Sequence, residues 1–229
     1  MKKSLRLKLN EFEEKICDFT KCKYACVVNS CTSALHLACL ALGISKDDEV
    51  IIPAISFAAS SNCVLYCGGK PIFCDINKST MNIDIDKLEA LITPKTKAII
   101  IVDFAGQVND YNRILKIKEK YNIKIIEDAA HSIGAKYNDK YVGNIADITT
   151  FSFHPVKNMT TGEGGAITTN DDTLYNKVKL LRSHGLTKDF TERNNNVSHD
   201  YDIVSLGYNY RICDILCALG ISQLKKLTL

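Results

Sequence analysis

The sequence predicts an α/β protein with a mostly parallel, mixed β-sheet and helices on both faces of that sheet. Short apolar runs that are typical of buried strands alternate with helical segments along most of the chain. The strand-like runs are apolar at nearly every position, as expected of strands that are covered on both sides. From residue 134 onward the alternation gives way to short strands separated by turns, which indicates a mixed sheet.

Helices and strands alternate through the first half of the chain. Residues 12–19 have apolar side chains at helical spacing, and residues 32–42 are apolar nearly all round until Gly43 ends that helix. Residues 97–104 form the most continuous β-branched run, and residues 110–121 are clearly amphipathic. The expected helices are 12–19, 32–42, 56–67, 83–92 and 110–121, and the expected strands are 25–29, 49–53, 71–76, 97–104 and 123–128.

The middle of the second half predicts short strands. Residues 134–143 have the pattern of a small hairpin with an Asn-Asp turn, and residues 148–153 and 165–170 read as two further strands. Residues 187–202 are polar and unpatterned, which predicts a mobile surface loop.

Two helices are expected toward the end of the chain. Asp171 and Asp172 are suitable N-caps for a helix that Gly185 would end. The last helix, within residues 211–227, has an apolar face, and the sequence stops directly after it. We therefore expect that face to be exposed, the isolated chain to be poorly soluble, and the sequence to be a fragment.

Composition places the chain among ordinary globular proteins. It has 229 residues, of which 46% are hydrophobic and 24% charged, and 29 Lys+Arg against 26 Asp+Glu leave a net charge of +3. A net charge this small does not indicate a protein that binds nucleic acid. The longest apolar runs are too short to span a bilayer, and the N-terminus lacks the apolar core of a signal peptide. A cytoplasmic protein is expected.

The ten cysteines are expected to be reduced thiols of the core. No CxxC motif occurs, and neither a metal site nor a disulfide framework is predicted. Three pairs have the i,i+4 spacing of helical packing: Cys22/Cys26, Cys63/Cys67 and Cys213/Cys217.

Three segments could carry chemistry, and the first is NSCTSA at residues 29–34. It lies between an expected strand and an expected buried helix, where the free N–H groups of the first turn could hold a phosphate with Thr32 and Ser33. A plain Ser/Thr N-cap is the alternative.

The second segment is EDAAH at residues 127–131, directly after an expected buried strand. Acidic residues at the carboxyl end of a parallel strand lie where α/β sheets bind ligands, so Asp128 could hold a protonated ring nitrogen or a metal. Alternatively, Glu127 or Asp128 caps the next segment, and His131 is a hydrogen-bonded loop histidine.

The third segment is SFHPVKNMTTGEGG at residues 152–165. A lysine held between two strands, as Lys157 would be, can be partly desolvated, which lowers its pKa and makes it a competent amine for a Schiff base. A solvated loop lysine is the alternative. The glycines at 162–165 match neither dinucleotide nor P-loop spacing, and we expect them to let the backbone pass close to a cofactor or a neighbouring subunit.

Together these segments are more specific than any one of them. A phosphate cradle, a carboxylate for a ring nitrogen and a lysine amine are the three partners that pyridoxal 5'-phosphate needs. The combination predicts a pyridoxal-phosphate enzyme.

From about Leu9 to its last residue, the chain resembles the DegT/StrS family of fold-type I, pyridoxal-phosphate-dependent sugar aminotransferases. The segments NSCTSALHLACLALGI, IIEDAAHSIGA, FSFHPVKNMTTGEGGAITTN and LGYNYRICDILCALGISQLKKL carry this resemblance. SFHPVKNMTTGEGG, RSHG and GYNYR are most similar to the branch that aminates C4 of a UDP-4-keto-6-deoxy-N-acetylhexosamine for pseudaminic acid synthesis. The resemblance implies the large domain of a fold-type I enzyme.

The resemblance also implies roles for residues around the cofactor ring. Lys157 would form the Schiff base and carry a proton between the cofactor and the sugar carbon. Asp128 would pair with the pyridine nitrogen, and Phe57 would stack on the ring. His131 stands near the cofactor, where many relatives have glutamine. A lysine at position 157 argues against the family's sugar dehydratases, which have histidine there.

Further residues would bind the cofactor phosphate. Thr32, Ser33 and Ser152 would contact it within the chain, and Asn209 would reach the phosphate of a partner subunit's cofactor, which implies a homodimer with shared active sites. The implied reaction has two halves: L-glutamate charges the cofactor, which then aminates the nucleotide sugar. Nucleic acid and membrane partners are not implied.

Two departures from the family pattern are visible. Relatives usually begin with an earlier segment, which MKKSLRLK replaces here, and continue beyond QLKKL into a smaller C-terminal domain. We therefore interpret residues 1–210 as the cofactor-binding large domain with an abbreviated lead segment. Residues 211–229 would be a helix leading to a small domain that is absent, which leaves the nucleotide-sugar site incomplete.

Other functions stay open at the level of sequence. The substrate could be another 4-keto nucleotide sugar, such as UDP-4-keto-arabinose or a perosamine precursor. The chain could also be an inactive truncated fragment that binds the cofactor without turnover. A nucleotide-binding or redox protein that uses its cysteines lacks a matching motif.

Overall fold

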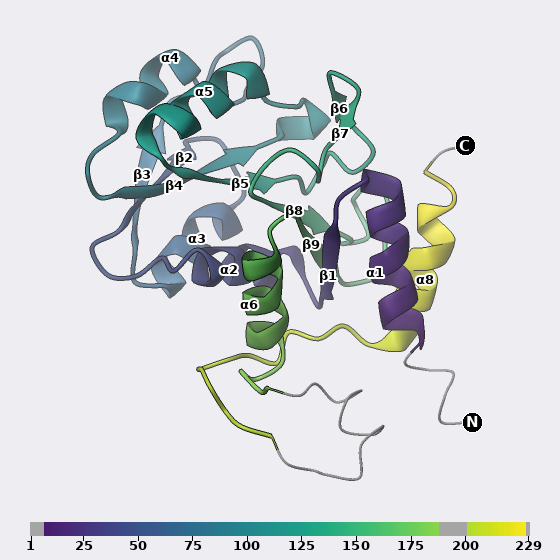
Figure 1. Ribbon diagram of the computed structural model, residues 1–229. Helices are drawn as coiled ribbons and strands as arrows, with labels where there is room; N and C mark the ends of the chain where they lie inside the picture. Colours follow the sequence, from purple (N-terminus) through teal and green to yellow (C-terminus); the bar gives the residue numbers. More distant parts are fainter. Residues whose placement is uncertain (1–6, 188–200, 228–229) are drawn as a thin grey trace.

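The computed structural model describes residues 7–187 and 201–227, which form a mixed seven-stranded sheet with helices on both faces (Figure 1). Parallel pairs link β3, β2, β4, β5 and β8, while β9 is antiparallel to both β8 and β1. The expected mostly parallel, mixed sheet is confirmed. The strand order is β1 (Tyr24–Val28), β9 (Gly165–Thr169), β8 (Ile148–Ser152), β5 (Lys124–Asp128), β4 (Thr96–Val102), β2 (Glu49–Pro53) and β3 (Lys70–Cys74).

The helices cover the two faces of the sheet in three groups. α2, α3 and α6 pack on one face, against side chains such as Val50 and Ile100. On the other face, α4 and α5 cover β2, β4 and β5, whereas α1 and α8 cover β1, β9 and β8. Neighbours such as Val50 and Ile51 point to opposite covered faces, which explains the continuous apolar runs. The helices are α1 (Leu7–Thr20), α2 (Cys31–Ala41), α3 (Ala58–Tyr66), α4 (Ile85–Leu88), α5 (Tyr111–Tyr121), α6 (Asp172–Arg182) and α8 (Asp214–Leu224).

Side-chain caps fix where several helices begin. Ser30 accepts a hydrogen bond from the N–H of Ser33 at the start of α2, and Asp110 does the same for Arg113 at the start of α5. Asp171 accepts from the N–H groups of Thr173 and Leu174, so the expected cap of α6 is confirmed, with Asp171 as the capping residue.

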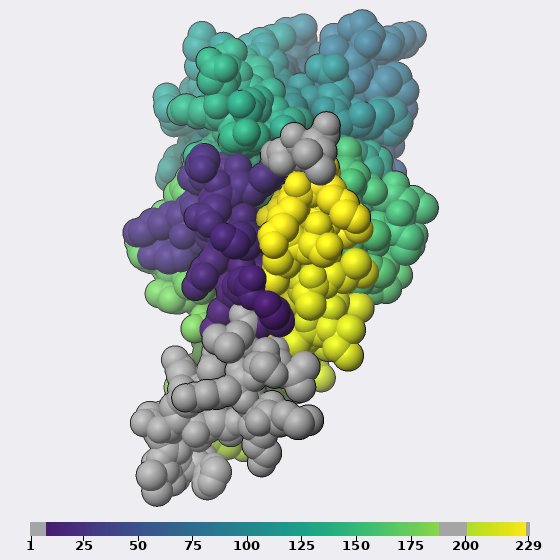
Figure 2. Space-filling model, turned by 90° about the vertical axis from the view of Figure 1, so that its right-hand side faces the viewer, coloured from purple at the N-terminus to yellow at the C-terminus, as the bar shows by residue number. Residues whose placement is uncertain are grey.

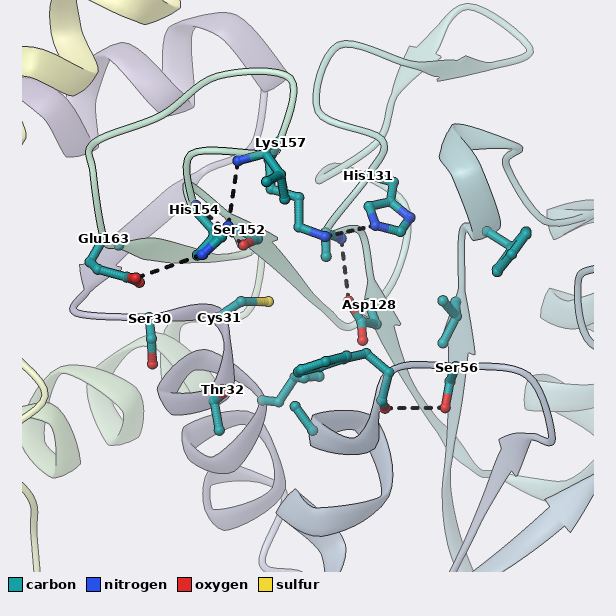
Figure 3. Close-up of a pocket in the computed structure, with 18 residues that line it drawn as sticks. Ser30, Cys31, Thr32, Ser56, Asp128, His131, Ser152, His154, Lys157 and Glu163 are labelled. Atoms are coloured by element: carbon teal, nitrogen blue, oxygen red, sulfur yellow. Dashed lines mark hydrogen bonds and ion pairs between the residues drawn. The ribbon is translucent and has the colours of Figure 1, made fainter.

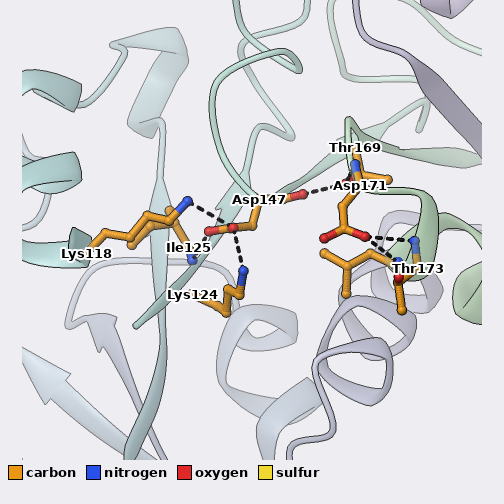
Figure 4. A network of polar contacts seen from close by, with 8 residues as sticks. Lys118, Lys124, Ile125, Asp147, Thr169, Asp171 and Thr173 are labelled. Atoms are coloured by element: carbon orange, nitrogen blue, oxygen red, sulfur yellow. Dashed lines mark hydrogen bonds and ion pairs between the residues drawn. The ribbon is translucent and has the colours of Figure 1, made fainter. Parts of the chain in front are cut away.

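The amino-terminal edge of the sheet is held by a polar network around Asp147, just before β8 (Figure 4). Its carboxylate lies 2.9 Å from Nζ of Lys118 and 3.1 Å from Nζ of Lys124, and it accepts a hydrogen bond from the N–H of Ile125. The Thr169 hydroxyl donates to its carbonyl. This network joins α5, β5, β8 and β9 at the edge opposite the candidate active site.

Two expectations about local structure have different outcomes. The hairpin at 134–143 is confirmed as β6 (Lys136–Tyr137) and β7 (Lys140–Tyr141), with left-handed φ angles of 46° and 64° at Asn138 and Asp139. The helix expected over 83–92 is wrong in length, because α4 is a single turn followed by a 3₁₀ turn (Glu89–Leu91). Pro94 follows closely, and it disfavours helical backbone just before it. Most of the loop expected at 187–202 lies outside the described residues.

The apolar face of the last helix has a partner within the chain, so its expected exposure is wrong. α8 packs along α1, and Figure 2 shows these two helices side by side, in purple and yellow. Gly220 makes this close approach possible, because a Cβ atom there would lie 2.4 Å from the Phe12 ring. Ile215 and Leu219 remain on the exposed side of α8.

All ten cysteines are free thiols. Cys213 is exposed in front of α8, so the expectation that it belongs to the core is wrong. No group of three or more histidine, cysteine or acidic side chains among the described residues could hold a metal ion. No helix in the described part of the chain is long and apolar enough to cross a membrane.

Candidate active site

A cavity of about 460 Å³ lies at the carboxyl-terminal edge of the sheet (Figure 3). The segments that follow β1, β2, β4, β5 and β8 all reach this edge, and the reversed direction of β9 brings its amino-terminal end there as well. The polar and charged residues of the lining are Ser30, Thr32, Ser56, Asp128, His131, Ser152, His154, Lys157 and Glu163.

Lys157 lies in the loop between β8 and β9 and is held by its neighbours. Its N–H donates to the carbonyl of His154, and the buried side chains of Phe153 and Met159 anchor the loop on either side. The lysine Nζ lies 2.7 Å from Nε2 of His131 (Figure 3). The amine is therefore directed toward the segment after β5.

His131 is suited to accept a hydrogen bond from that amine. Burial, and then the positive charge of Lys157, lower the pKa of His131 below its ordinary value of 6.5, with Asp128 opposing this shift. A neutral imidazole has one acceptor nitrogen, which can accept a hydrogen bond from Nζ of Lys157.

Asp128 ends β5 as a carboxylate that is only 4% exposed. Its Oδ2 accepts a hydrogen bond from the hydroxyl of Ser60 at 2.7 Å, and its Oδ1 accepts from the N–H of Ala130 at 3.3 Å. Burial raises the pKa of Asp128, and the hydrogen bond from Ser60 is the largest opposing influence. Within residues 7–187 and 201–227 it forms no ion pair, so a cationic N–H group in the cavity would complete its environment.

The first turn of α2 borders the cavity. Thr32 lines the cavity beside Ser30, at a helix end that presents free N–H groups. Ser152 lines the opposite side at the end of β8.

Gly165 allows the first turn of α2 to lie against β9. A Cβ atom at position 165 would lie 2.7 Å from the backbone N of Cys31 and 2.7 Å from the carbonyl carbon of Ser30. The close approach at Gly165 is thus between β9 and the chain's own backbone at the start of α2. Gly164, by contrast, lines the cavity.

The structure brings most of the expected site residues together. Ser33 does not line the cavity, because its hydroxyl donates to Oδ1 of Asn29 and its N–H to the capping hydroxyl of Ser30. Asn209 is exposed and also lies outside the cavity. Those that line the cavity are Thr32, Phe57, Asp128, His131, Ser152 and Lys157.

Sequence reasoning missed three side chains of the site. Ser60, fully buried on α3, holds Asp128 across 68 residues of sequence. His154 and Glu163 face each other at the two ends of the lysine loop, with Nε2 and Oε1 3.8 Å apart. Their places within the SFHPVK and GEGG motifs were the available signal, whereas a serine inside a helix carries none.

Comparisons with known proteins show which family the chain resembles. The sequence profile of the DegT/DnrJ/EryC1/StrS aminotransferase family matches residues 6–229. The chain is 48% identical over 223 residues to the UDP-4-amino-4,6-dideoxy-N-acetyl-beta-L-altrosamine transaminase of Campylobacter jejuni (strain 81-176), covering 96% of the chain and 57% of that protein. It is 45% identical over 216 residues to the GDP-perosamine synthase of Caulobacter vibrioides, covering 94% and 56%.

Solved structures give the same picture. Helicobacter pylori PseC, an aminotransferase involved in the biosynthesis of pseudoaminic acid, superposes with a TM-score of 0.87 at 40% identity, covering 96% of this chain and 58% of that one. The PLP form of Spr1654 from Streptococcus pneumoniae superposes with a TM-score of 0.88 at 35% identity, covering 96% of this chain and 59% of that one. The chain thus spans a little over half the length of the curated relatives it matches, at 57% and 56%.

Proposed function

The chain belongs to the DegT/DnrJ/EryC1/StrS aminotransferase family, and from this premise we propose that it transfers an amino group from L-glutamate to C4 of a UDP-4-keto-6-deoxy-N-acetylhexosamine. Pyridoxal 5'-phosphate is the proposed cofactor. One observation carries the proposal: the buried carboxylate of Asp128, which forms no ion pair with the described residues, and the amine of Lys157 face the same cavity.

The residues present fit this cofactor. A protonated pyridine nitrogen would give Asp128 the cationic partner that it lacks among the described residues. The free N–H groups at the start of α2, with Thr32 and with Ser152 opposite, suit its phosphate. Phe57, which is 75% exposed at the mouth of the cavity, offers an aromatic face.

Residues of this chain have separate roles in the proposed proton transfer. When bound, pyridoxal phosphate supplies an electron sink that makes a proton on the adjacent carbon removable. Lys157 holds and moves that proton at Nζ, and His131 fixes Nζ through its acceptor nitrogen. Asp128 keeps negative charge at the cofactor's ring nitrogen, and the Ser60 hydroxyl holds that carboxylate in orientation.

The choice of sugar rests on similarity to relatives. The match to the Campylobacter altrosamine transaminase favours a UDP-4-keto sugar, and the similar identity to the Caulobacter GDP-perosamine synthase favours a GDP-linked sugar as the second candidate. The two differ in the nucleotide. Turnover with a panel of both 4-keto substrates, followed by mass spectrometry of the amino sugar, decides between them.

We also propose that the protein acts as a homodimer in the cytoplasm. Asn209 is exposed outside the cavity, and the neighbouring Ile203 and Leu206 are 73% and 81% exposed, as expected of a surface that meets a second subunit. Ten free thiols agree with a reducing compartment. Sedimentation velocity on the purified chain tests the dimer, and a strictly monomeric species would contradict it.

The first test of the activity is the visible absorption spectrum of the chain with pyridoxal phosphate, before and after addition of L-glutamate. We expect a band from the lysine-bound cofactor that shifts when glutamate donates its amino group. Lys157→Arg is the matched control, because it keeps a cation beside His131 but cannot bind the cofactor covalently. A folded chain without a band, or a band unchanged in the variant, would refute the assignment.

A further inference from the structure

Asp103 has a buried carboxylate at the end of β4. Its neighbours Val102 and Phe104 line the catalytic cavity, whereas Asp103 itself does not. Its Oδ1 accepts hydrogen bonds from the backbone N–H and the side-chain amide of Asn109, at 3.2 Å and 2.9 Å, and its Oδ2 accepts from the hydroxyl of Ser132 at 2.7 Å. An apolar side chain would fill a buried position at a lower cost in desolvation, so core packing does not explain this carboxylate.

Asp103 is attached to both ends of the short segment 128–132. Its backbone N–H donates to the carbonyl of Asp128 at 3.2 Å, and its side chain holds the hydroxyl of Ser132. The residues between these two points lead into a tight turn, which carries His131. One residue thus fixes both ends of the stretch that presents Asp128 and His131 to the cavity.

The loop after β4 also packs against the backbone of His131. Gly106 has a left-handed φ of 87°, and a Cβ atom there would lie 3.1 Å from the His131 carbonyl oxygen. The buried side chain of Asn82 accepts a hydrogen bond from the N–H of Phe104 and donates one to the carbonyl of Gln107. The loop that begins at the buried carboxylate is therefore itself held in place, as a support for a site residue must be.

We propose that Asp103 is a positioning residue for His131 and acts through the hydroxyl of Ser132. The carboxylate holds the turn so that Nε2 of His131 stays 2.7 Å from Nζ of Lys157 (Figure 3). This inference rests on the proposed function, in which His131 fixes the lysine amine for proton transfer. Because Asp103 does not line the cavity, it acts only through the turn.

Nuclear magnetic resonance of the full chain without cofactor tests the position of His131. With histidine labelled with carbon-13 at Cε1, the signal that is missing from His131→Gln identifies this ring, and its titration gives the pKa. In the parent chain, burial and then the charge of Lys157 hold the pKa of His131 below 6.5, while Asp128 opposes them. A ring that moves away from the amine and into solvent should therefore titrate closer to 6.5.

Ser132→Ala removes the hydroxyl and, with it, the link between the turn and Asp103. We expect the pKa of His131 to rise toward 6.5 in this variant, because the ring is released from its buried place beside Lys157. The acid limb of the glutamate-driven spectral change should move to higher pH with it, since the ring becomes protonated earlier as the pH falls.

Thr149→Val is the matched control, because it removes a hydrogen bond of the same length to another buried carboxylate. The hydroxyl of Thr149 donates to Oε2 of Glu127 at 2.7 Å, and Thr149 does not line the cavity. We expect both variants to unfold at lower urea concentrations than the parent, but only Ser132→Ala to shift the pKa of His131. An equal shift in both would mean that a general loosening moves the ring, which would overturn the proposal.

Asp103→Asn separates the hydrogen bond from the negative charge. The two N–H groups of Asn109 keep the amide oxygen at the Oδ1 position, so the amide nitrogen faces Ser132 and can donate to its hydroxyl. The link then persists with its donor reversed, and we expect the pKa of His131 to stay closer to the parent value than in Ser132→Ala. A shift as large as in Ser132→Ala would show that the charge controls the ring, and would contradict the proposed link.

The titration and the proposed activity can fail separately. A parent chain whose cofactor spectrum does not respond to L-glutamate would refute the aminotransferase proposal, while the titration would still decide whether Asp103 positions His131. If the pKa of His131 is the same in Ser132→Ala as in the parent chain, the positioning role is refuted, even in an active enzyme.

Discussion

Ser60 illustrates how much one buried hydroxyl can contribute at the residue scale. Its hydrogen bond is the largest influence that opposes the burial of the Asp128 carboxylate. Ser60→Ala should therefore raise the pKa of Asp128 further and weaken the binding of the protonated pyridine ring of pyridoxal phosphate by this carboxylate. A hydrogen bond to a charged group contributes about 1.5–3 kcal/mol, so we expect cofactor affinity to fall by roughly 10- to 100-fold. Fluorescence titration with pyridoxal phosphate measures this.

Ser61 is the matched control for Ser60. It lies on the same helix, but its hydroxyl donates to the backbone carbonyl of Ala58. Ser61→Ala should leave the affinity for pyridoxal phosphate within about twofold, because it touches no group of the cavity. Equal losses in both variants would mean that α3 itself is disturbed and that Ser60 has no specific role.

His131 makes a prediction about pH. Because its pKa lies below 6.5, the ring becomes protonated as the pH falls through that lowered value and then cannot accept from Nζ of Lys157. The rate of the glutamate-driven spectral change should fall on that acid side. His131→Gln keeps an acceptor that does not titrate, so the acid limb should shrink while the rate at pH 8 stays within about tenfold. An unchanged acid limb would contradict this role.

At the scale of the elements, the ends of β4 and β5 bury two further acids. Asp103 and Glu127 are both fully buried, and burial raises the pKa of each, most strongly for Glu127, with the charge of Asp103 as the next cause. Because the folded-state pKa of Glu127 lies above its ordinary value of 4.5, its contribution to stability is full below that pH and is lost as the pH rises.

Glu127→Gln tests this sign, since glutamine resembles the protonated acid. We expect the variant to match the parent chain near pH 4.5 and to unfold at a higher urea concentration at pH 8. Glu163→Gln, at a side chain that is 67% exposed, is the control and should show no such pH-dependent gain. A variant less stable than the parent at pH 8 would refute the assignment of a protonated Glu127.

Sequence patterns predicted these elements well, and their partners poorly. Apolar runs and caps located the strands and most helices, but periodicity shows that α8 has an apolar face without showing that α1 covers it. Asp128, His131 and Lys157 could be predicted to lie near one another because they stand at or shortly after the ends of β5 and β8, two parallel strands. Ser60 was not, because its partner is distant in sequence, and the direction of the Ser33 hydroxyl depends on the local cap.

At the scale of the whole molecule, α1 and α8 pack against each other and together cover one end of the sheet. Phe12 is fully buried between these helices, and its ring lies 5.4 Å from that of Phe153, beside the lysine loop. Phe12→Ala should lower the free energy of unfolding by about 3–5 kcal/mol, as for other buried aromatic truncations. Urea denaturation measures the loss.

Leu219→Ala provides the comparison on the outer side of α8. That side chain is 40% exposed, so its removal should cost no more than about 1 kcal/mol. If the two substitutions lowered the free energy of unfolding equally, the packing of α8 against α1 would contribute little to the stability of the fold.

The single reversed strand also sets the order of events during synthesis. β1 is synthesised before every other strand of the sheet, yet its partner there is β9, the last of these strands, with Tyr24 paired to Thr169. The α1 helix waits in the same way for α8. Such distant pairings close slowly, because a long loop must be ordered first. We therefore expect α1 and β1 to become native only after β9 and α8 have been made, and their apolar surface to stay exposed until then.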